Sequence, residues 1–172
     1  MTGLISIICD PERPAEASEK LCNSIKKNKW VQLLSAKEIQ EDLSSHLLPI
    51  GAGILMKTGG SSKRSKQCLH PFSHLDKSAA ATAQWLKTQG LDPKQCHIFN
   101  PLPIHHMSGL MPWWRSQCWG CHHIWLPPSL MRDPISLENK FPSSIKSSKG
   151  IAITSLVPTQ LYRLIQHEAG VR

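Results

Sequence analysis

A segment rich in glycine, hydroxyl and cationic residues follows a short apolar run, Ile54-Leu55-Met56, in the first half of the chain. The segment reads Lys57-Thr58-Gly59-Gly60-Ser61-Ser62-Lys63-Arg64-Ser65-Lys66 and contains no acidic residue. Glycine lets a turning backbone direct several N–H groups at one point, while hydroxyl and ammonium groups add donors and positive charge. A polyphosphate needs these groups, so the segment predicts a loop that binds the phosphates of ATP. The alternative is a plain surface loop rich in Gly, Ser and Lys.

A pair of histidines lies in a second candidate stretch, Asn100-Pro101-Leu102-Pro103-Ile104-His105-His106-Met107-Ser108-Gly109-Leu110. The prolines prevent regular structure there, so the two imidazoles should lie on a loop or at a strand end. Such places carry function more often than the elements they join. The alternative is a histidine pair that packs in the interior and binds nothing.

A third stretch, Cys118-Trp119-Gly120-Cys121-His122, has the C-x-x-C-H spacing of a c-type haem attachment site. It also offers three ligands of a zinc site. Haem attachment of that kind follows export, and the N-terminus has no export signal. Zinc would need a further ligand, and His105-His106 is the only near candidate. A small metal or haem protein that uses Cys118, Cys121 and His122 therefore stays an alternative.

The elements that must position these residues alternate between strand and helix. Short apolar or β-branched runs predict the strands Gly3–Cys9, Gly53–Met56, Cys96–Phe99, His122–Leu126 and Ile151–Leu156. Helical spacing and capping patterns predict helices from Pro14, from Ser35, from Phe72 to near Gly90, at Leu110–Trp119, within Asp133–Lys149 and at Pro158–Gln166. This alternation predicts an α/β fold with a mostly parallel sheet covered by helices. Ligands bind at the carboxyl ends of such strands, so the glycine-rich segment and the histidine pair should meet at one edge of the sheet.

Composition limits the class of protein. The 172 residues are 40% hydrophobic and 19% charged, which is typical of a globular domain. The net charge of +8 is spread over several segments without an aromatic-lined basic face, so we expect no nucleic-acid partner. No apolar run approaches the ~20 residues that a membrane span needs. Without an export signal we expect the chain in the cytoplasm, with its six cysteines as thiols.

Three segments, in order, resemble core motifs of the adenylate-forming (AMP-binding) acid–CoA ligase superfamily. Thr58 to Lys66 resembles its phosphate loop, [ST]-[SG]-G-[ST]-[ST]-G-x-P-K-G. Leu102 to Leu110 resembles the family's L-P-L-F-H-x-x-G-L element, with His106 on the family histidine, and Val157 to Leu161 reads V-P-T-Q-L as the family does. The positions that differ from the phosphate-loop pattern are Lys63, Ser65 and Gln67.

The resemblance implies a partial large domain of the ligase fold, incomplete at the C-terminus. Residues 1–50 would be an N-terminal scaffold and residues 51–172 a partial AMP-binding domain, with the C-terminal lid domain absent. The implied cofactors and substrates are ATP, Mg²⁺, CoA and a carboxylic acid, with no metal ligand in the chain. The implied phosphate-binding residues are Thr58, Gly59, Gly60, Ser61, Ser62, Lys63 and Lys66. The residues that would border the acid and the adenylate are His106, Ser108 and Gly109.

From Leu48 onward, the detailed amino-acid sequence is similar to that of the cyanobacterial type of 2-succinylbenzoate–CoA ligases, which are enzymes of menaquinone and phylloquinone synthesis. One example is Ser108-Gly109-Leu110-Met111-Pro112-Trp113-Trp114-Arg115. The family's adenine-binding and lid segments come later than Arg172, so we expect this chain to be inactive alone or to need a complementing C-terminal fragment. A non-catalytic remnant or interaction protein built on the same fragment is the alternative.

Overall fold

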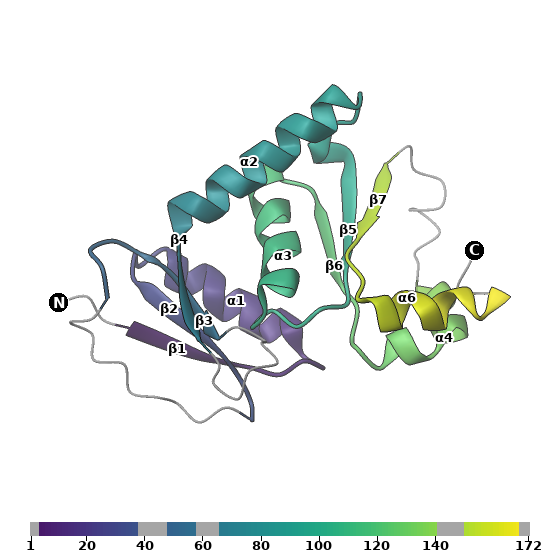
Figure 1. Cartoon of the computed structure of the whole chain (residues 1–172), viewed down its shortest axis with the longest axis horizontal. Helices are drawn as coiled ribbons and strands as arrows, with labels where there is room; N and C mark the ends of the chain where they lie inside the picture. Colours follow the sequence, from purple (N-terminus) through teal and green to yellow (C-terminus); the bar gives the residue numbers. More distant parts are fainter. Residues whose placement is uncertain (1–3, 38–47, 58–65, 141–149, 169–172) are drawn as a thin grey trace.

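The computed structural model describes residues 4–37, 48–57, 66–140 and 150–168, and their strands form two sheets (Figure 1). The first sheet has the order β1 (Leu4–Cys9), β2 (Trp30–Ser35), β3 (Gly53–Lys57) and β4 (Gln67–Pro71). The second has the order β6 (His122–Trp125), β5 (Cys96–Asn100) and β7 (Ile151–Thr154). All strand pairs are parallel except β3 with β4. The predicted α/β fold with mostly parallel strands is confirmed, although the described strands are divided between two sheets.

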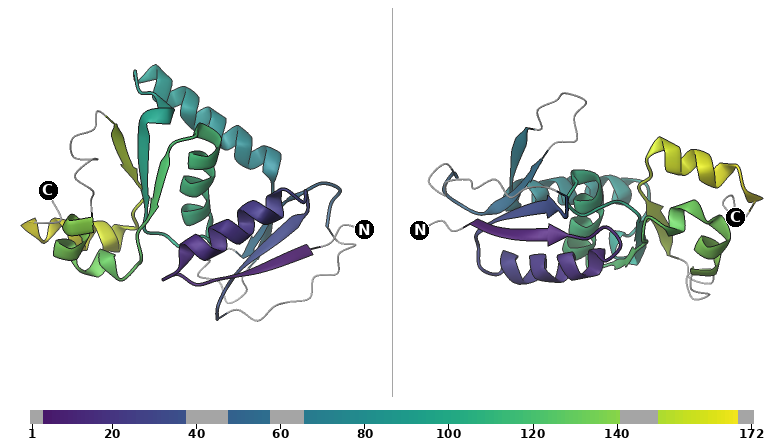
Figure 2. Two further views of the ribbon diagram at one scale, coloured as in Figure 1. Left: turned by 180° about the vertical axis from the view of Figure 1, so that it is seen from behind. Right: turned by 90° about the horizontal axis from the view of Figure 1, so that it is seen from below.

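The helices are α1 (Pro14–Ile25), α2 (Phe72–Thr88), α3 (Met107–Trp119), α4 (Pro134–Lys140) and α6 (Pro158–Ile165), with short 3-10 turns η2 (Pro93–Gln95) and η3 (Leu130–Arg132). Figure 2 shows α4 and α6 at the end of the molecule away from the first sheet. Proline starts α1, where its fixed φ suits the first turn, and α2 ends just before Gly90, whose φ is +74°. None of the described helices is long and apolar enough to cross a membrane.

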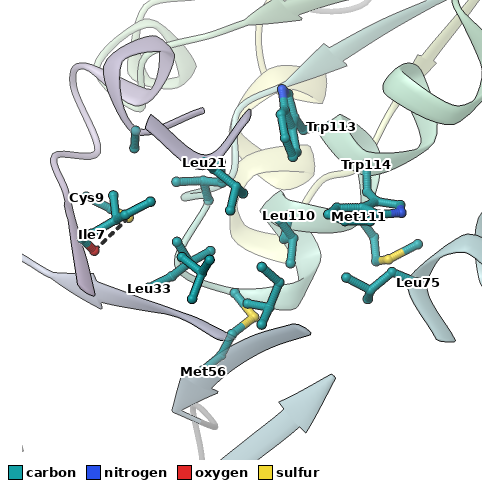
Figure 3. Close-up of a cluster of buried hydrophobic side chains, with 14 of the residues drawn as sticks. Ile7, Cys9, Leu21, Leu33, Met56, Leu75, Leu110, Met111, Trp113 and Trp114 are labelled. Atoms are coloured by element: carbon teal, nitrogen blue, oxygen red, sulfur yellow. Dashed lines mark hydrogen bonds between the residues drawn. The ribbon is translucent and has the colours of Figure 1, made fainter. Parts of the chain in front are cut away.

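Helix α3 lies between the two sheets and joins their cores (Figure 1). Its buried residues Leu110 and Trp113 pack with β1, β2, β3 and α1 in the main core, as Figure 3 shows. At its other end, Trp119 packs with Cys96 and Ile98 of β5. The indole N–H groups find partners: Trp114 donates to Asp76 Oδ1 (2.9 Å) and Trp119 to the Ala79 carbonyl (3.0 Å). The tryptophans of α3 are therefore core residues that fix α2 against α3.

The predicted helix from Ser35 is wrong at its start. Residues 30–35 form β2, which pairs with β1 on one side and β3 on the other, and Ala36-Lys37 form a turn. The Ser35 hydroxyl accepts the Lys37 N–H (3.3 Å), so the hydroxyl caps this turn and not a helix. Burial of both faces of the apolar run Trp30–Leu34 outweighs the local capping pattern. The rest of the predicted helix, from Glu38, lies outside the described residues.

Two helices differ from the sequence expectation in detail. Helix α3 begins at Met107 and not at the predicted Leu110, so Pro112 lies well inside it. Helix α6 ends at Ile165, one residue before the predicted Gln166, and of its apolar residues Leu161, Leu164 and Ile165 only Leu164 is buried. Leu161 and Ile165 are 50% and 54% exposed.

Candidate functional site

The glycine-rich segment is flanked by two paired strands. Met56 of β3 pairs with Cys68 of β4, and Lys57 with Gln67, in antiparallel register. The chain therefore leaves β3 and re-enters β4 at the same end of this strand pair. The expected phosphate-binding residues Thr58, Gly59, Gly60, Ser61, Ser62 and Lys63 lie outside the described residues. Lys66 is described: it is exposed and directly precedes β4.

His106 stands at the N-terminus of α3. Its backbone carbonyl accepts the N–H groups of Gly109 (3.0 Å) and Leu110 (2.8 Å), and its own N–H donates to the Pro103 carbonyl (3.0 Å). The His106 side chain is exposed, whereas His105 is 7% exposed and its ring centroid lies 4.3 Å from that of His106. The buried imidazole therefore supports the exposed one, and only His106 of the predicted pair can meet a ligand in the open.

Asn100, at the end of β5, holds the stretch that carries His106. Its side chain is fully buried: Nδ2 donates to the Gly109 carbonyl (2.8 Å), and Oδ1 accepts the Leu102 N–H (3.2 Å). Gly109 also has to be glycine, because a Cβ there would collide with the carbonyl groups of Pro103 and Leu102. Gly109, which was predicted to border the adenylate, is buried and shapes the turn beneath the site.

His123 of β6 extends this network. Its Nε2 lies 3.2 Å from Asn100 Nδ2, and because the amide nitrogen donates, Nε2 is the acceptor and the proton lies on Nδ1. Burial lowers the pKa of His123 to about 4. The ring also packs edge-on against Trp125, with centroids 4.5 Å apart. A neutral His123 thus supports Asn100, which connects the second sheet to the start of α3.

A pocket of about 480 Å³ opens where the β3–β4 pair meets the start of α3. The strands contribute Met56, Lys57, Cys68 and His70, and the helix contributes His106, Met107 and Ser108. The two predicted stretches therefore do come together, at the stem of the glycine-rich segment, which is the Lys57–Gln67 pair where the chain leaves β3 and enters β4. They do so from different sheets and not along one sheet edge, because α3 carries His106 from β5 across to β3. Lys66 is not among the residues that line the pocket.

The pocket combines apolar walls with basic groups. Met56 is a buried lining residue, and no Asp or Glu is among the lining residues that the structure describes. Burial, with a smaller effect from the nearby His74, lowers the pKa of His70. Cys68 and His70 were missed in the sequence because β4 was not predicted. Their i, i+2 spacing directly after the loop is the signal that would have placed them on one face of a returning strand.

The C-x-x-C-H stretch does not assemble a metal site in the described part of the chain. Cys118 is exposed and its thiol donates to Asp76 (3.7 Å), whereas Cys121 packs in the cluster around β5. Burial raises the pKa of each thiol to about 11. His122 stacks on His97, with ring centroids 5.1 Å apart. Among the described residues no three or more His, Cys, Asp or Glu side chains converge to hold a metal ion.

Comparison with known proteins relates the chain to acid–CoA ligases by structure. No protein-family model matches the chain, and no curated protein sequence matches it significantly. A solved structure of o-succinylbenzoate CoA synthetase from Bacillus subtilis, in complex with its acyl-adenylate intermediate, matches 96% of this chain with 42% of its own length, at 16% identity and a TM-score of 0.51. The same enzyme with ATP and magnesium ion gives 14% identity, 96% and 42% coverage, and a TM-score of 0.50.

A malonyl-CoA ligase with methylmalonyl-CoA and AMP bound matches 94% of this chain with 41% of its own length, at 12% identity and a TM-score of 0.58. The chain thus spans about two fifths of the length of these ligases. At these identities the likeness concerns the fold. The described chain has the fold of part of an adenylate-forming acid–CoA ligase domain.

Proposed function

We propose that this chain is the ATP- and acid-binding part of an AMP-forming acid–CoA ligase. The observation that carries the proposal is the pocket between β3, β4 and α3, which joins the stem of the glycine-rich segment to His106. Phosphates would bind to Thr58, Gly59, Gly60, Ser61, Ser62, Lys63 and Lys66. The acid would lie in the pocket beside His106 and Ser108.

The proposed reaction has two steps. A carboxylate oxygen of the acid attacks the α-phosphorus of ATP, which forms an acyl-adenylate and releases pyrophosphate. The thiol of CoA then attacks the acyl carbon, and AMP leaves. The first step brings two anions together, so preorganised positive charge and N–H donors should lower its barrier. Lys57 at the pocket and Lys66 at the far end of the segment would supply such charge.

The described residues have positioning roles in this proposal. His106 is held by its backbone hydrogen bonds and by the ring of His105, so its imidazole can orient the acid without rearranging. Ser108 adds a hydroxyl at the pocket wall. Mg²⁺, which proteins commonly bind together with substrate phosphates, would enter with ATP and supply positive charge beside the phosphates.

The acid that we propose is 2-succinylbenzoate, converted to 2-succinylbenzoyl-CoA in the cytoplasm during menaquinone or phylloquinone synthesis. The resemblance of several sequence segments to 2-succinylbenzoate–CoA ligases and the likeness to the fold of o-succinylbenzoate CoA synthetase support this choice. The apolar side chains of Met56 and Met107 suit a flat aromatic ring. The likeness to malonyl-CoA ligase makes malonate the competing acid.

The proposal is tested first by binding. The 172-residue chain is titrated with ATP and Mg²⁺ by calorimetry, as wild type, as Lys66→Ala and as the control Lys87→Ala. Lys87 is an exposed lysine in the last turn of α2, away from the pocket. Loss of one charge-assisted contact should weaken ATP binding about tenfold or more in Lys66→Ala and leave Lys87→Ala unchanged. Absence of ATP binding to the wild type, or equal affinities in all three, would contradict the proposal.

Catalysis is tested separately by pyrophosphate release with 2-succinylbenzoate, ATP and Mg²⁺. Release that depends on Lys66 would show retained chemistry. ATP binding without release indicates a non-catalytic remnant that keeps the nucleotide site, which is the alternative reading of the sequence.

A further inference from the structure

His70 lies deep along the β3–β4 pair and has no part in the proposed reaction. It pairs with Ile54 in the strand register, three pairs away from Lys57 and Gln67, where the glycine-rich segment begins and ends. At a rise of ~3.4 Å per residue, its Cα is about 10 Å from that stem. His70 and Lys57 therefore line the pocket at two separate places, so that His70 can meet a different acidic group from one held at the stem.

We propose that His70 is a specificity-determining residue that binds a second acidic group of the substrate, so that the pocket selects a dicarboxylic acid. This inference rests on the proposed function. One carboxylate would lie toward Lys57, and the other would reach His70, three strand pairs away along the pocket. Met56 and Met107 would contact the apolar part of the substrate between them.

The charges around His70 favour an anion. The basic groups that line the pocket are His70 itself, Lys57 from β3 and His106 from α3, and Cys68 is its other ionisable lining residue. His74 of α2 is a further titratable neighbour, and it contributes to lowering the pKa of His70. No acidic residue is among the described lining residues. A neutral ligand would leave this set of basic groups without a function, whereas a dicarboxylate engages both ends.

Binding should also change the protonation of His70. Burial, and to a smaller degree His74, lower the pKa of His70 in the empty pocket, so its imidazole is neutral at pH 7. A carboxylate placed beside the ring favours the charged form and raises the pKa. The second acidic group should therefore bind together with a proton, and the affinity for a dicarboxylate should increase as the pH falls from 8 to 6.

The experiment compares two acids that differ only in the second carboxylate: 2-succinylbenzoate and 4-oxo-4-phenylbutanoate. Calorimetry measures their affinities for the full chain as wild type, His70→Gln, His70→Arg and the control His74→Gln. His74 is an exposed histidine four residues later and outside the pocket lining. Circular dichroism checks that each variant is folded. Titrations in two buffers of different ionisation enthalpy measure proton uptake.

We expect the wild type and His74→Gln to bind the dicarboxylate about tenfold more tightly than the monocarboxylate, with proton uptake for the dicarboxylate alone. His70→Gln should lose this preference and keep its monocarboxylate affinity. His70→Arg should keep the preference without proton uptake, because arginine is always charged. A preference that survives in His70→Gln, or its absence from the wild type, overturns the inference. Neither result touches ATP binding through Lys66, so this inference and the proposed function can fail independently.

Discussion

Replacement of Asn100 by leucine tests whether this one amide holds the candidate site together. Asn100 is fully buried and makes three contacts: it donates to the Gly109 carbonyl (2.8 Å), accepts the Leu102 N–H (3.2 Å) and faces His123 Nε2 (3.2 Å). Leucine has a similar volume, so the change removes hydrogen bonds without opening a large cavity. The effect should therefore report on polar contacts and not on packing.

The expected cost follows from these contacts. The buried N–H of Leu102 loses its acceptor, and an unsatisfied buried donor costs about 1–3 kcal/mol. Loss of the bonds to Gly109 and His123 costs about 0.5–1.5 kcal/mol each. The sum is about 2–6 kcal/mol, a large part of the about 5–15 kcal/mol by which domains are usually stable. Because Gly109 lies in the first turn of α3, His106 should also lose its fixed position.

Urea unfolding followed by tryptophan fluorescence measures this change in the free energy of unfolding. Asn23→Leu, at an exposed position of α1, is the control and should change stability by less than about 0.5 kcal/mol. If Asn100→Leu costs no more than the control, Asn100 does not anchor the site. A second readout is acid binding in the pocket, which should weaken in the folded fraction of Asn100→Leu and not in Asn23→Leu.

Three further perturbations follow from the same region. The pKa of His123 is about 4 in the folded chain, whereas its ordinary value is 6.5, so the unfolded chain takes up the proton first as the pH falls. Protonation of His123 should therefore cost about 2 kcal/mol of stability between pH 7 and pH 4.5. Urea titrations at both pH values should show that His123→Gln removes this loss. Gly109→Ala should lower the free energy of unfolding by about 1–3 kcal/mol, because the new Cβ collides with neighbouring carbonyl groups. Gly120→Ala meets open space and should cost only about 1–2 kcal/mol, which comes from its φ of +67°. Thermal unfolding measures both changes. Burial and then Asp76 raise the pKa of Cys118 to about 11, so iodoacetamide should label this exposed thiol slowly at pH 8, and Asp76→Asn should speed the labelling measured by mass spectrometry.

Elements with strong local patterns could be predicted from the sequence. Helix α1 has proline at its start and buries Ala17 and Leu21 at helical spacing, and α2 buries Leu75 and Ala79 before it ends near Gly90. In these helices the local signals and the tertiary packing agree. Their prediction needed no knowledge of the partners.

Elements that depend on their neighbours were missed or misread. The capping pattern at Ser35 favours a helix locally, but pairing of Ser35 with Cys9 of β1 makes it the end of a strand. Strand β4 ends in proline and is only weakly apolar, and it exists because the register with β3 brings Leu69 opposite Leu55. Pro71 is tolerated there because β4 is an edge strand of its sheet. Such strands are determined by pairing, which a local pattern does not encode.

The candidate site, too, was predicted in part from the sequence and missed in part. The sequence predicted that the glycine-rich segment and His106 would meet, and the structure brings the stem of that segment and His106 to one pocket. Their meeting along one sheet edge was wrong, because β3 and β5 belong to different sheets. Asn100 was missed because a polar residue at the end of a strand resembles an ordinary turn residue. Only its burial and its hydrogen bonds to Leu102 and Gly109 reveal its role.

The two walls of the pocket are attached to different sheets. One wall is the β3–β4 pair of the first sheet, and the other is the start of α3, which Asn100 attaches to the second sheet while His123 contacts Asn100 from β6. The width of the pocket therefore depends on how α3 is seated between the sheets and not on either sheet alone. A substitution at His123, which does not line the pocket, should still change acid binding by moving His106 relative to His70. A change at a buried residue of a different core cluster, such as Leu137 of α4, should alter stability but leave the ratio of dicarboxylate to monocarboxylate affinity unchanged.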